Sequence, residues 1–365
     1  MIRRCIHIVG GLSLIGTVAG CPVPPGDDPV ATDAPITACE NTFPSKAGLL
    51  NQERPEPGEA LDPRESVLPE RLSETGLYLD IENKTVHPAM RYYEPQYQLW
   101  SDGADKQRWT YIPECEPIDS SDMDNWQFPV GTRFFKEFSL NGKRLETRLI
   151  ERIGPGPRDF AYASYQWNDT ETEATRVDSA GKSNVAGTPH DIPSKSQCLM
   201  CHGTYAYGGG RPSRGLGFSA LQLNHSGNGT KLTDLTPILS HPPTALPDFP
   251  GSGAERDALG YLHANCGNCH NDSRDGLPQS DLDLWVKVDV TSVAETGAYR
   301  TAIGKPTMTF ADQHVSGRIV KGNAAESAVL YRMEARGNSA QMPPIASEYV
   351  DQTGVELVRA WVDSL

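Results

Sequence analysis

One short pattern occurs twice in this chain of 365 residues and limits its possible folds more than any other feature. Two cysteines stand three positions apart and a histidine follows the second directly, at Cys198, Cys201 and His202 and again at Cys266, Cys269 and His270. A group that uses two thiols and an imidazole together must therefore be accommodated at two places in the fold.

Three chemistries use a Cys-x-x-Cys pair. A thioredoxin-like redox pair needs no histidine after it. A zinc site made of two pairs usually has roughly 15 to 20 residues between them, whereas Cys201 and Cys266 are much farther apart, and zinc does not explain a histidine after both pairs. Two thiols one helical turn apart can instead add to the two vinyl groups of one porphyrin, with the next histidine on the iron. The pattern therefore predicts two covalently bound haem c groups, with His202 and His270 as iron ligands.

The N-terminus has the form of an export signal, predicted over residues 1–20, with basic "MIRR" before an apolar stretch too short for a good membrane span. It ends in "TVAGC", which resembles the lipobox of bacterial lipoproteins and implies a lipid on Cys21. An ordinary secretory signal is the alternative. Residues 21–73 are rich in Pro, Asp and Glu and are predicted to form an acidic tether. We expect an exported protein, lipid-anchored in the bacterial cell envelope, in the periplasm or at the outer-membrane surface.

The chain has eight cysteines, of which Cys5 leaves with the signal, Cys21 would carry the lipid and four belong to the two motifs. Cys39 and Cys115 remain, and two thiols in an oxidising compartment predict a disulfide between them. The net charge of −14 argues against nucleic acid as a partner, because phosphates require clustered lysine and arginine. The same charge permits docking with a basic protein.

Residues 74–186 are predicted to form a β-rich domain. "GTRFFKEFSL" and "KRLETRLIERI" flank Asn141-Gly142, which is a strong hairpin signal, and "FAYASYQW" is a third strand. In the second strand Leu145, Thr147 and Leu149 alternate with other residues in a half-buried pattern. The stretch "YQLWSDGADKQRW" offers Trp100, Asp102, Lys106 and Arg108 for a substrate pocket or docking face, or for a loop and strand stabilised by local charges.

Residues 253–365 are expected to be mainly helical. "GAERDALGYLHANC" predicts a helix that leads into the second motif, and "NSAQMPPIAS" follows it at a distance. Asp351 is the expected N-cap of a closing helix, and one face of that helix carries Val355, Val358, Trp361, Val362 and Leu365.

This part of the chain resembles the cytochrome c family, in which an entering helix, Cys-x-x-Cys-His, a Met-Pro loop and a closing helix occur in this order. The resemblance implies that His270 is the proximal iron ligand and Met342 the distal one. A core methionine is the alternative for Met342, with Met333 and Met308 as reserve ligands.

The same resemblance implies a close crossing of the first and last helices at Gly260 and Trp361. The chain departs from the simplest pattern at "LDLWVKVDV", which is interpreted as an inserted strand.

Residues 187–252 form the first haem-binding segment, and Pro193 leaves no room for a helix before its motif. Met200 lies between the two cysteines and is not expected to reach the far side of the iron. Candidates for the distal ligand, without ranking, are His225, His241, His190 and His263. If none binds, the iron keeps an open position.

From about Leu72 onward the chain resembles a family of exported bacterial dihaem proteins. The phrases that carry this resemblance are "LWSDGADKQRW", "FPVGTRFFKEF", "LETRLIER", "SQCLMCH", "LQLN" and "NCGNCHND". We therefore expect an α+β multidomain chain, with an antiparallel β domain before a mainly α-helical, cytochrome c-like haem-binding region.

The leading hypothesis is a membrane-anchored electron carrier whose redox partner is a dehydrogenase, a quinol oxidase or another cytochrome. The alternatives are a haem-dependent oxidoreductase whose β domain binds a small substrate, and a surface binding lipoprotein in which haem is structural. Whether the chain is an enzyme stays open at this point.

Overall fold

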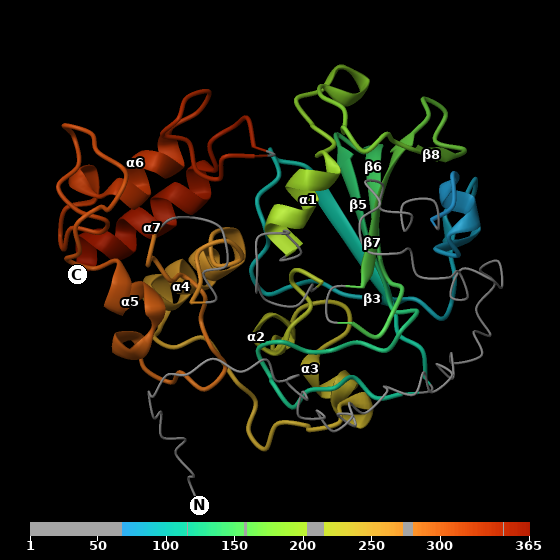
Figure 1. Cartoon of the computed structure of the whole chain (residues 1–365), viewed down its shortest axis with the longest axis horizontal. Helices are drawn as coiled ribbons and strands as arrows, with labels where there is room; N and C mark the ends of the chain where they lie inside the picture. Colours follow the sequence, from blue (N-terminus) through green and yellow to red (C-terminus); the bar gives the residue numbers. More distant parts are fainter. Residues whose placement is uncertain (1–67, 115, 157–158, 203–214, 273–279, 346) are drawn as a thin grey trace, which may run out of the picture. The chain divides into compact units, whose positions relative to one another are not determined.

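The computed structural model describes residues 68–114, 116–156, 159–202, 215–272, 280–345 and 347–365. An antiparallel β-sheet region comes first along the chain and a mainly helical part follows it, so the fold is α+β as predicted (Figure 1). The expected signal, the lipid site at Cys21 and the expected disulfide between Cys39 and Cys115 lie outside the described residues.

The described chain starts at Leu68, which is buried together with Leu72 in a core beneath the sheet. Both residues fall within the range 21–73 that we predicted as a tether, and their apolar side chains lie against the sheet rather than in solvent.

The described residues form eight strands: β1 Tyr78–Asp80, β2 Thr85–Val86, β3 Arg91–Tyr92, β4 Asp105–Tyr111, β5 Arg133–Leu140, β6 Lys143–Arg152, β7 Phe160–Trp167 and β8 Ala174–Arg176. Strands β1 and β2 pair separately, and β3 to β8 form one antiparallel sheet in sequence order. The predicted hairpin is confirmed: β5 and β6 are joined by Asn141 and Gly142, both with positive φ, as a tight two-residue turn requires. The predicted third strand is β7.

The sheet has two different faces because side chains alternate along each strand. One face packs Trp109, Phe135 and Leu149, which are cross-strand neighbours, into a core with Leu72 and Tyr165. The sheet thereby covers its own N-terminal chain.

The half-buried pattern predicted for β6 is wrong on the second face. Glu146, which should face solvent in that pattern, is fully buried, and the Arg148 side chain is only 23% exposed. Helix α1 (Lys195–His202) contacts the neighbouring strand β7 (Figure 1). Farther along this face Phe134 packs with Phe218 and other apolar residues, so both faces of the sheet are covered.

The other α-helices are α2 Ala220–Leu223, α3 Leu232–Leu235, α4 Gly253–Asn265, α5 Gly297–Thr301, α6 Ala328–Glu334 and α7 Gln352–Ser364. Short 3-10 turns occur at Leu72–Glu74, Val185–Gly187, Thr236–Ile238, Val293–Glu295 and Ala324–Glu326. The predicted entering and closing helices are therefore α4 and α7, and the Asp351 carboxylate accepts from the Gly354 amide as the expected N-cap of α7.

Helices α4 and α7 pack against each other, but not at the glycine that we expected. A Cβ atom on Gly354 of α7 would lie 2.2 Å from the Tyr261 ring of α4, so the close approach of the helices depends on Gly354. A Cβ atom on Gly260 would instead meet the Tyr97 ring at 2.1 Å. Gly260 thus accommodates the loop between β3 and β4, whereas Trp361 lies in the core that α4 and α7 share.

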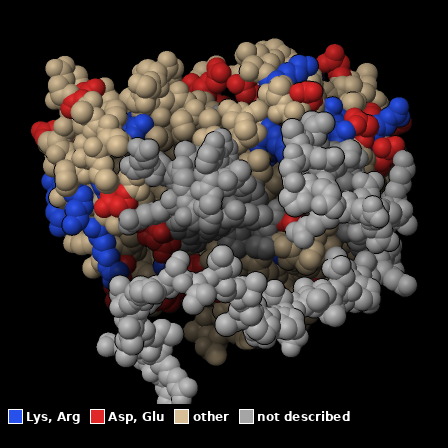
Figure 2. Space-filling view, in the orientation of Figure 1, with Lys and Arg blue, Asp and Glu red and all other residues tan. Residues whose placement is uncertain are grey.

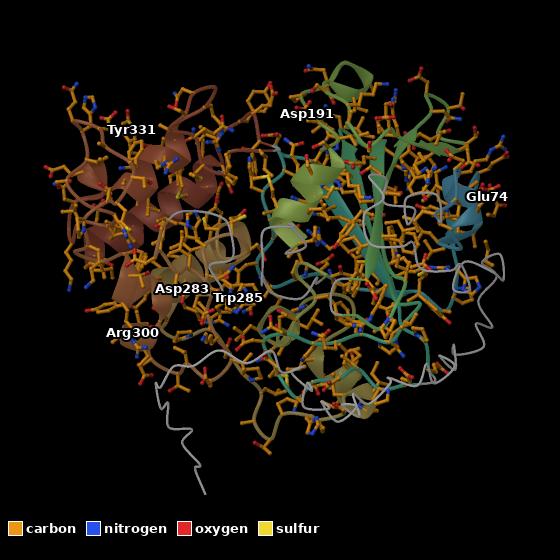
Figure 3. All side chains as sticks on the ribbon, in the orientation of Figure 1. Glu74, Asp191, Asp283, Trp285, Arg300 and Tyr331 are labelled. Carbon is orange, nitrogen blue, oxygen red and sulfur yellow. The ribbon has the colours of Figure 1, made fainter. Side chains whose placement is uncertain are left out.

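The segment 282–290, interpreted as an inserted strand, has no strand structure. Its backbone amides bond elsewhere: Leu284 donates to the carbonyl of His270 at 2.9 Å, and Val286 donates to Nδ1 of His263 at 3.0 Å. Trp285, labelled in Figure 3, lies against the His263 ring with a centroid distance of 4.1 Å. In this segment apolar and polar residues alternate as they do in a strand, although the backbone pairs with no neighbouring strand.

The described surface carries charges of both signs. On the face drawn in Figure 2, acidic and basic side chains occur in small groups among a majority of uncharged residues. In the part of the chain that the structure describes, no helix has the length and apolar character needed to cross a bilayer.

Candidate functional site

The first Cys-x-x-Cys-His motif lies on helix α1, whose start is fixed by local hydrogen bonds. The Ser194 amide donates to the Gln197 side chain at 2.8 Å, and the Gln197 amide donates to the Ser194 hydroxyl at 3.3 Å. This reciprocal pair is a capping box, and it starts the helix directly after Pro193. Helical geometry then places Cys198 and Cys201 on one face, one turn apart.

The second motif is a tight helical turn at the end of α4. The amides of Cys269 and His270 both donate to the carbonyl of Cys266, at 3.0 and 2.8 Å. Gly267 makes this turn possible, because a Cβ atom there would lie 2.8 Å from the carbonyl oxygen of His263. Both motifs thus have the local geometry for two thioether bonds to one porphyrin.

The two motifs meet in space although they lie far apart along the chain. The thiols of Cys201 and Cys269 are hydrogen-bonded, and this bond, together with burial, holds the pKa of Cys201 well above its usual value. Cys269 Sγ also lies 4.0 Å from the carbonyl oxygen of Met200, a residue 69 positions away. None of the four motif cysteines forms a disulfide within the described residues.

A large cavity, which we call the motif cavity, opens beside this contact. It encloses about 1460 Å³, counting its open mouth, and its lining includes Cys198, Cys201, His202, Cys269 and Pro343. The side of the cavity that the sheet forms includes Phe134, Phe135, Leu149 and Tyr162. The apolar lining and the adjacent thiols of Cys198, Cys201 and Cys269 suit a large aromatic group.

His270 has the properties of a ligand that lacks its partner. Its Nδ1 atom is buried and has no hydrogen-bond partner among the described residues. Burial, followed by the charges of Arg332 and Arg318, lowers the pKa of His270 to about 4. The imidazole is therefore neutral at pH 7, which is the form that binds a metal. His202 of the first motif lies with its ring 5.6 Å from the Tyr162 ring at the sheet.

The Met-Pro loop lies at the same cavity. Pro343, Pro344 and Ile345 line the motif cavity, and the Met342 amide donates to the carbonyl of Arg332 at 2.9 Å. The Arg332 guanidinium also donates to the carbonyl of Ala340 at 2.9 Å. The arginine that acts on His270 therefore also holds the loop of Met342.

The reserve methionines are less suited to reach an iron beside His270. Met308 is 63% exposed, and Met333 is buried in the helical core with Trp361. Met342 itself is half-buried. The assignment of Met342 as a distal ligand stays a prediction.

The four histidines that we considered as distal ligands for the first motif lie in different surroundings. His225 uses both ring nitrogens on the backbone of Glu94 and Gly227, and His241 is exposed on a loop. His263 accepts a backbone amide and lies on α4, before the second motif. Only His190, among these four, lines the motif cavity together with His202.

The loop between β3 and β4 contacts the helical part of the fold. The Trp100 amide donates to the Asn265 side chain at 2.7 Å, and its indole donates to the carbonyl of Tyr349 at 3.1 Å. The Asp102 carboxylate accepts from the amides of Glu348 and Tyr349. Trp100 and Asp102 thus clamp the helical part against the sheet region, and both also line the motif cavity.

Lys106 on β4 is partly buried, and its ammonium donates to the carbonyl of Leu99 at 2.8 Å. Burial, followed by the charge of Arg108, lowers the pKa of Lys106 from 10.5 to about 8. Between about pH 8 and 10.5 the unfolded chain therefore binds more protons at this residue than the folded chain. The free energy of unfolding gains a contribution that rises with pH over this window.

We expect Lys106→Met to remove this pH-dependent contribution. Relative to the variant, the wild-type free energy of unfolding should rise by about 2 kcal/mol between pH 8 and 10, because the unfolded chain holds about 0.8 more protons on average over this range and one pKa unit corresponds to about 1.4 kcal/mol. Urea unfolding at several pH values measures it, with Lys143→Met in the exposed hairpin as a control. A difference between wild type and variant that is equal at pH 8 and pH 10 would contradict the prediction.

Sequence reasoning missed several residues of the motif cavity, including Lys136 and Arg148 on the sheet and Asn268 inside the second motif. The alternation of residues along β5 and β6 could have indicated that Lys136 and Arg148 share one face of the sheet. In the described part of the chain no group of three or more His, Cys, Asp or Glu side chains is arranged to hold a metal ion.

No family model, curated protein or solved structure matches this chain. The resemblances noted from the sequence therefore remain expectations, and the functional argument depends on the geometry of the motifs.

Proposed function

We propose that the chain is a dihaem c-type cytochrome that carries electrons at the bacterial cell envelope, anchored through lipid on Cys21. The observation that supports this most strongly is that residues of both motifs line one cavity, namely Cys198, Cys201 and His202 of the first and Cys269 of the second, with Cys201 and Cys269 in contact. The two attachment points are adjacent, as suits two one-electron centres that exchange electrons. Haem iron supplies that one-electron chemistry when bound.

In this proposal the residues of the chain have distinct roles. Cys198 and Cys201 hold one haem and Cys266 and Cys269 hold the other. His202 and His270 are the proximal iron ligands. The half-buried Met342 would supply a thioether to the iron that His270 binds, and a thioether ligand raises the reduction potential.

The surroundings exclude water and position these groups. The sheet covers one side of the motif cavity with apolar side chains, and the clamp of Trp100 and Asp102 keeps the helical part against it. Burial keeps His270 unprotonated, so it is ready to bind iron at neutral pH. The net charge of −14 suits a basic redox partner such as a dehydrogenase, a quinol oxidase or another cytochrome.

The test is the haem content and spectrum of protein purified from a host that matures c-type cytochromes. We expect two haems per chain by pyridine haemochrome quantitation, both low-spin, in a reduced-minus-oxidised spectrum. Colourless protein with free thiols, or with zinc on them, would refute the proposal.

A second function is favoured by the position of the sheet at the first motif. His202 lies against Tyr162 of β7, and both residues line the motif cavity, so the sheet contributes side chains at the first motif, as a haem-dependent oxidoreductase with a substrate-binding β domain requires. His190 in that cavity is held by Glu146 at 2.8 Å, which restrains it. One high-spin haem that binds carbon monoxide would favour the oxidoreductase, and its absence would favour the carrier.

Replacing Met342 with Ala should abolish the sulfur-to-iron absorption near the red end of the oxidised spectrum and lower the reduction potential of one haem. The reason is the loss of the thioether that favours reduced iron. Spectroelectrochemical titration measures both effects, and Met308→Ala is the control because that side chain is 63% exposed. Persistence of the band in Met342→Ala and its loss in Met333→Ala would move the assignment to Met333.

A further inference from the structure

Three cations lie side by side on the inner face of the sheet. Arg108 on β4 is directly opposite Lys136 on β5, and Lys136 is directly opposite Arg148 on β6. We call these three residues the cation row. Like charges placed directly opposite each other destabilise a sheet, so this arrangement weakens the fold unless an anion balances it.

One member of the cation row, Arg148, already has an anionic partner on this face. The Glu146 carboxylate binds Arg148 through two hydrogen bonds, at 2.7 and 2.9 Å, and also binds His190 at 2.8 Å. Its capacity for further donors is largely used. Arg148 is therefore neutralised, while Arg108 and Lys136 are not.

Arg108 is unsatisfied although it is only 2% exposed. Its Nη2 atom lies 3.4 Å from the Gln98 side-chain oxygen, and its Nη1 atom is buried with no partner in the described part of the chain. The nearby acidic side chain of Glu94 acts on Arg108 only through space. A buried guanidinium normally binds an acceptor with each of its nitrogens.

Lys136 is likewise without an anion. Its ammonium lies 4.9 Å over the Phe138 ring, and no acceptor or acidic partner bonds to it among the described residues. Burial, followed by the charges of Arg108, Lys106 and Arg148, lowers the pKa of Lys136 well below its usual range. A negative charge placed here would give the Lys136 ammonium an anionic partner and would raise its pKa again.

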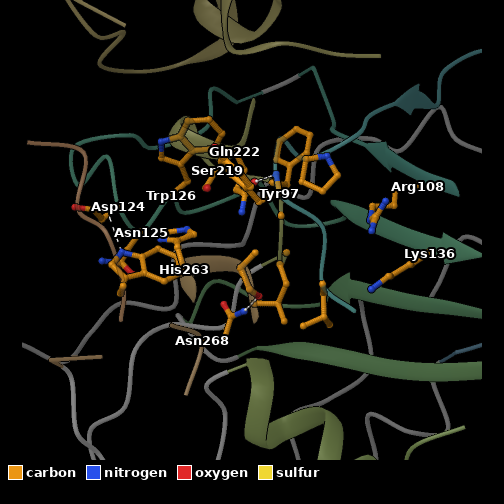
Figure 4. Close-up of a pocket in the computed structure, with 18 of the residues that line it drawn as sticks. Tyr97, Arg108, Asp124, Asn125, Trp126, Lys136, Ser219, Gln222, His263 and Asn268 are labelled. Atoms are coloured by element: carbon orange, nitrogen blue, oxygen red, sulfur yellow. Dashed lines mark hydrogen bonds between the residues drawn. The ribbon is translucent and has the colours of Figure 1, made fainter. Parts of the chain in front are cut away.

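The unpaired groups open into cavities. A second cavity, which we call the aromatic cavity, encloses about 660 Å³ and is lined by Arg108 and Lys136 together with Trp126, Phe128 and Phe218. Figure 4 shows Arg108 and Lys136 projecting from neighbouring strands into it. Lys136 also lines the motif cavity with Arg148, so the cation row lies where the two cavities adjoin.

We propose that the cation row is a binding site for one carboxylate, held by Nη1 of Arg108 and the ammonium of Lys136 where the two cavities adjoin. A carboxylate has two oxygens for these two donors, and charge-assisted hydrogen bonds of this kind are strong. Glu146 demonstrates the same chemistry on the next strand. The apolar cavity walls favour an organic acid.

The carboxylate has two possible sources, a small free organic acid and a propionate of the haem. The first goes beyond the proposed electron carrier and does not depend on it, and the second rests on that function. Sodium succinate is the probe for the free acid, titrated calorimetrically into the full-length haem-loaded protein at constant ionic strength. Wild type is compared with Lys136→Met and with Lys143→Met, which removes a lysine from the exposed hairpin.

If a free acid is the occupant, wild type binds succinate saturably, Lys136→Met binds it at least tenfold more weakly, and Lys143→Met is unchanged. If the propionate is the occupant, no succinate binds, and the propionate bending mode in the resonance Raman spectrum shifts in Lys136→Met only. Either result supports the site. Absence of succinate binding together with an unshifted Raman mode overturns it.

The proposed function and this site fail in different ways. Protein without haem refutes the cytochrome proposal. The succinate titration still measures whether the cation row binds a carboxylate. Lys136→Met is not expected to melt below wild type, because it removes a desolvated charge from among other cations. A thermal melt therefore separates loss of binding from loss of folding.

Discussion

Replacing Cys266 and Cys269 with Ala should remove one of the two haems and leave about half of the wild-type pyridine haemochrome absorbance per chain. The reason is that a c-type haem stays on the polypeptide through thioethers to both cysteines of its own motif. Replacing Cys198 and Cys201 should remove the other haem. The quadruple variant should be colourless.

The matched control is Met200→Leu, which alters the first motif but keeps all four thiols. It should retain two haems, since the residue between the cysteines provides no bond to the porphyrin. A double variant of either motif that kept the full haem content would show that the haem is not attached there. The contact of Cys201 with Cys269 adds a further expectation, that loss of one haem shifts the reduction potential of the other.

Trp361→Ala is expected to lower the free energy of unfolding by about 3–5 kcal/mol, as truncation of a fully buried tryptophan commonly does. Trp361 on α7 is 0% exposed and lies in the core with Leu259 and Leu262 of α4 and Leu330 of α6. Its removal leaves a large cavity at the junction of these helices. Urea unfolding followed by far-UV circular dichroism measures the change.

Two further variants make the result specific to packing. Trp361→Phe should lower the free energy of unfolding far less, because it keeps a ring in the core and removes an indole N–H that has no partner among the described residues. Leu79→Ala should have little effect, since Leu79 is 61% exposed. A loss in Trp361→Ala no larger than in Leu79→Ala would contradict the central place of α7 in this core.

Much of the local structure could be predicted from the sequence. Asn141-Gly142 between two alternating runs located the β5–β6 hairpin, and helical periodicity located α4 and α7. These signals act within a few residues, because turn geometry and helix capping are satisfied by neighbours in the chain.

The errors arose where a distant segment decided the outcome. The segment 282–290 alternates like a strand, but its amides bond to His263 and His270 instead of a neighbouring strand. Gly260 has a helical context, yet the group that requires its missing side chain is Tyr97, far earlier in the chain. A single sequence does not say which distant side chain will lie against a given residue.

By itself the sequence determined the two Cys-x-x-Cys-His motifs, the hairpin and the helices that position the second motif. Only the tertiary structure decided that Cys201 meets Cys269 and that Lys136 lies between Arg108 and Arg148. The register shows the reason. Counted from the two-residue turn, Lys136 would face position 147, but an irregularity between Phe138 and Ser139 shifts the pairing by one residue and brings Arg148 opposite. Such a shift depends on packing across the whole sheet.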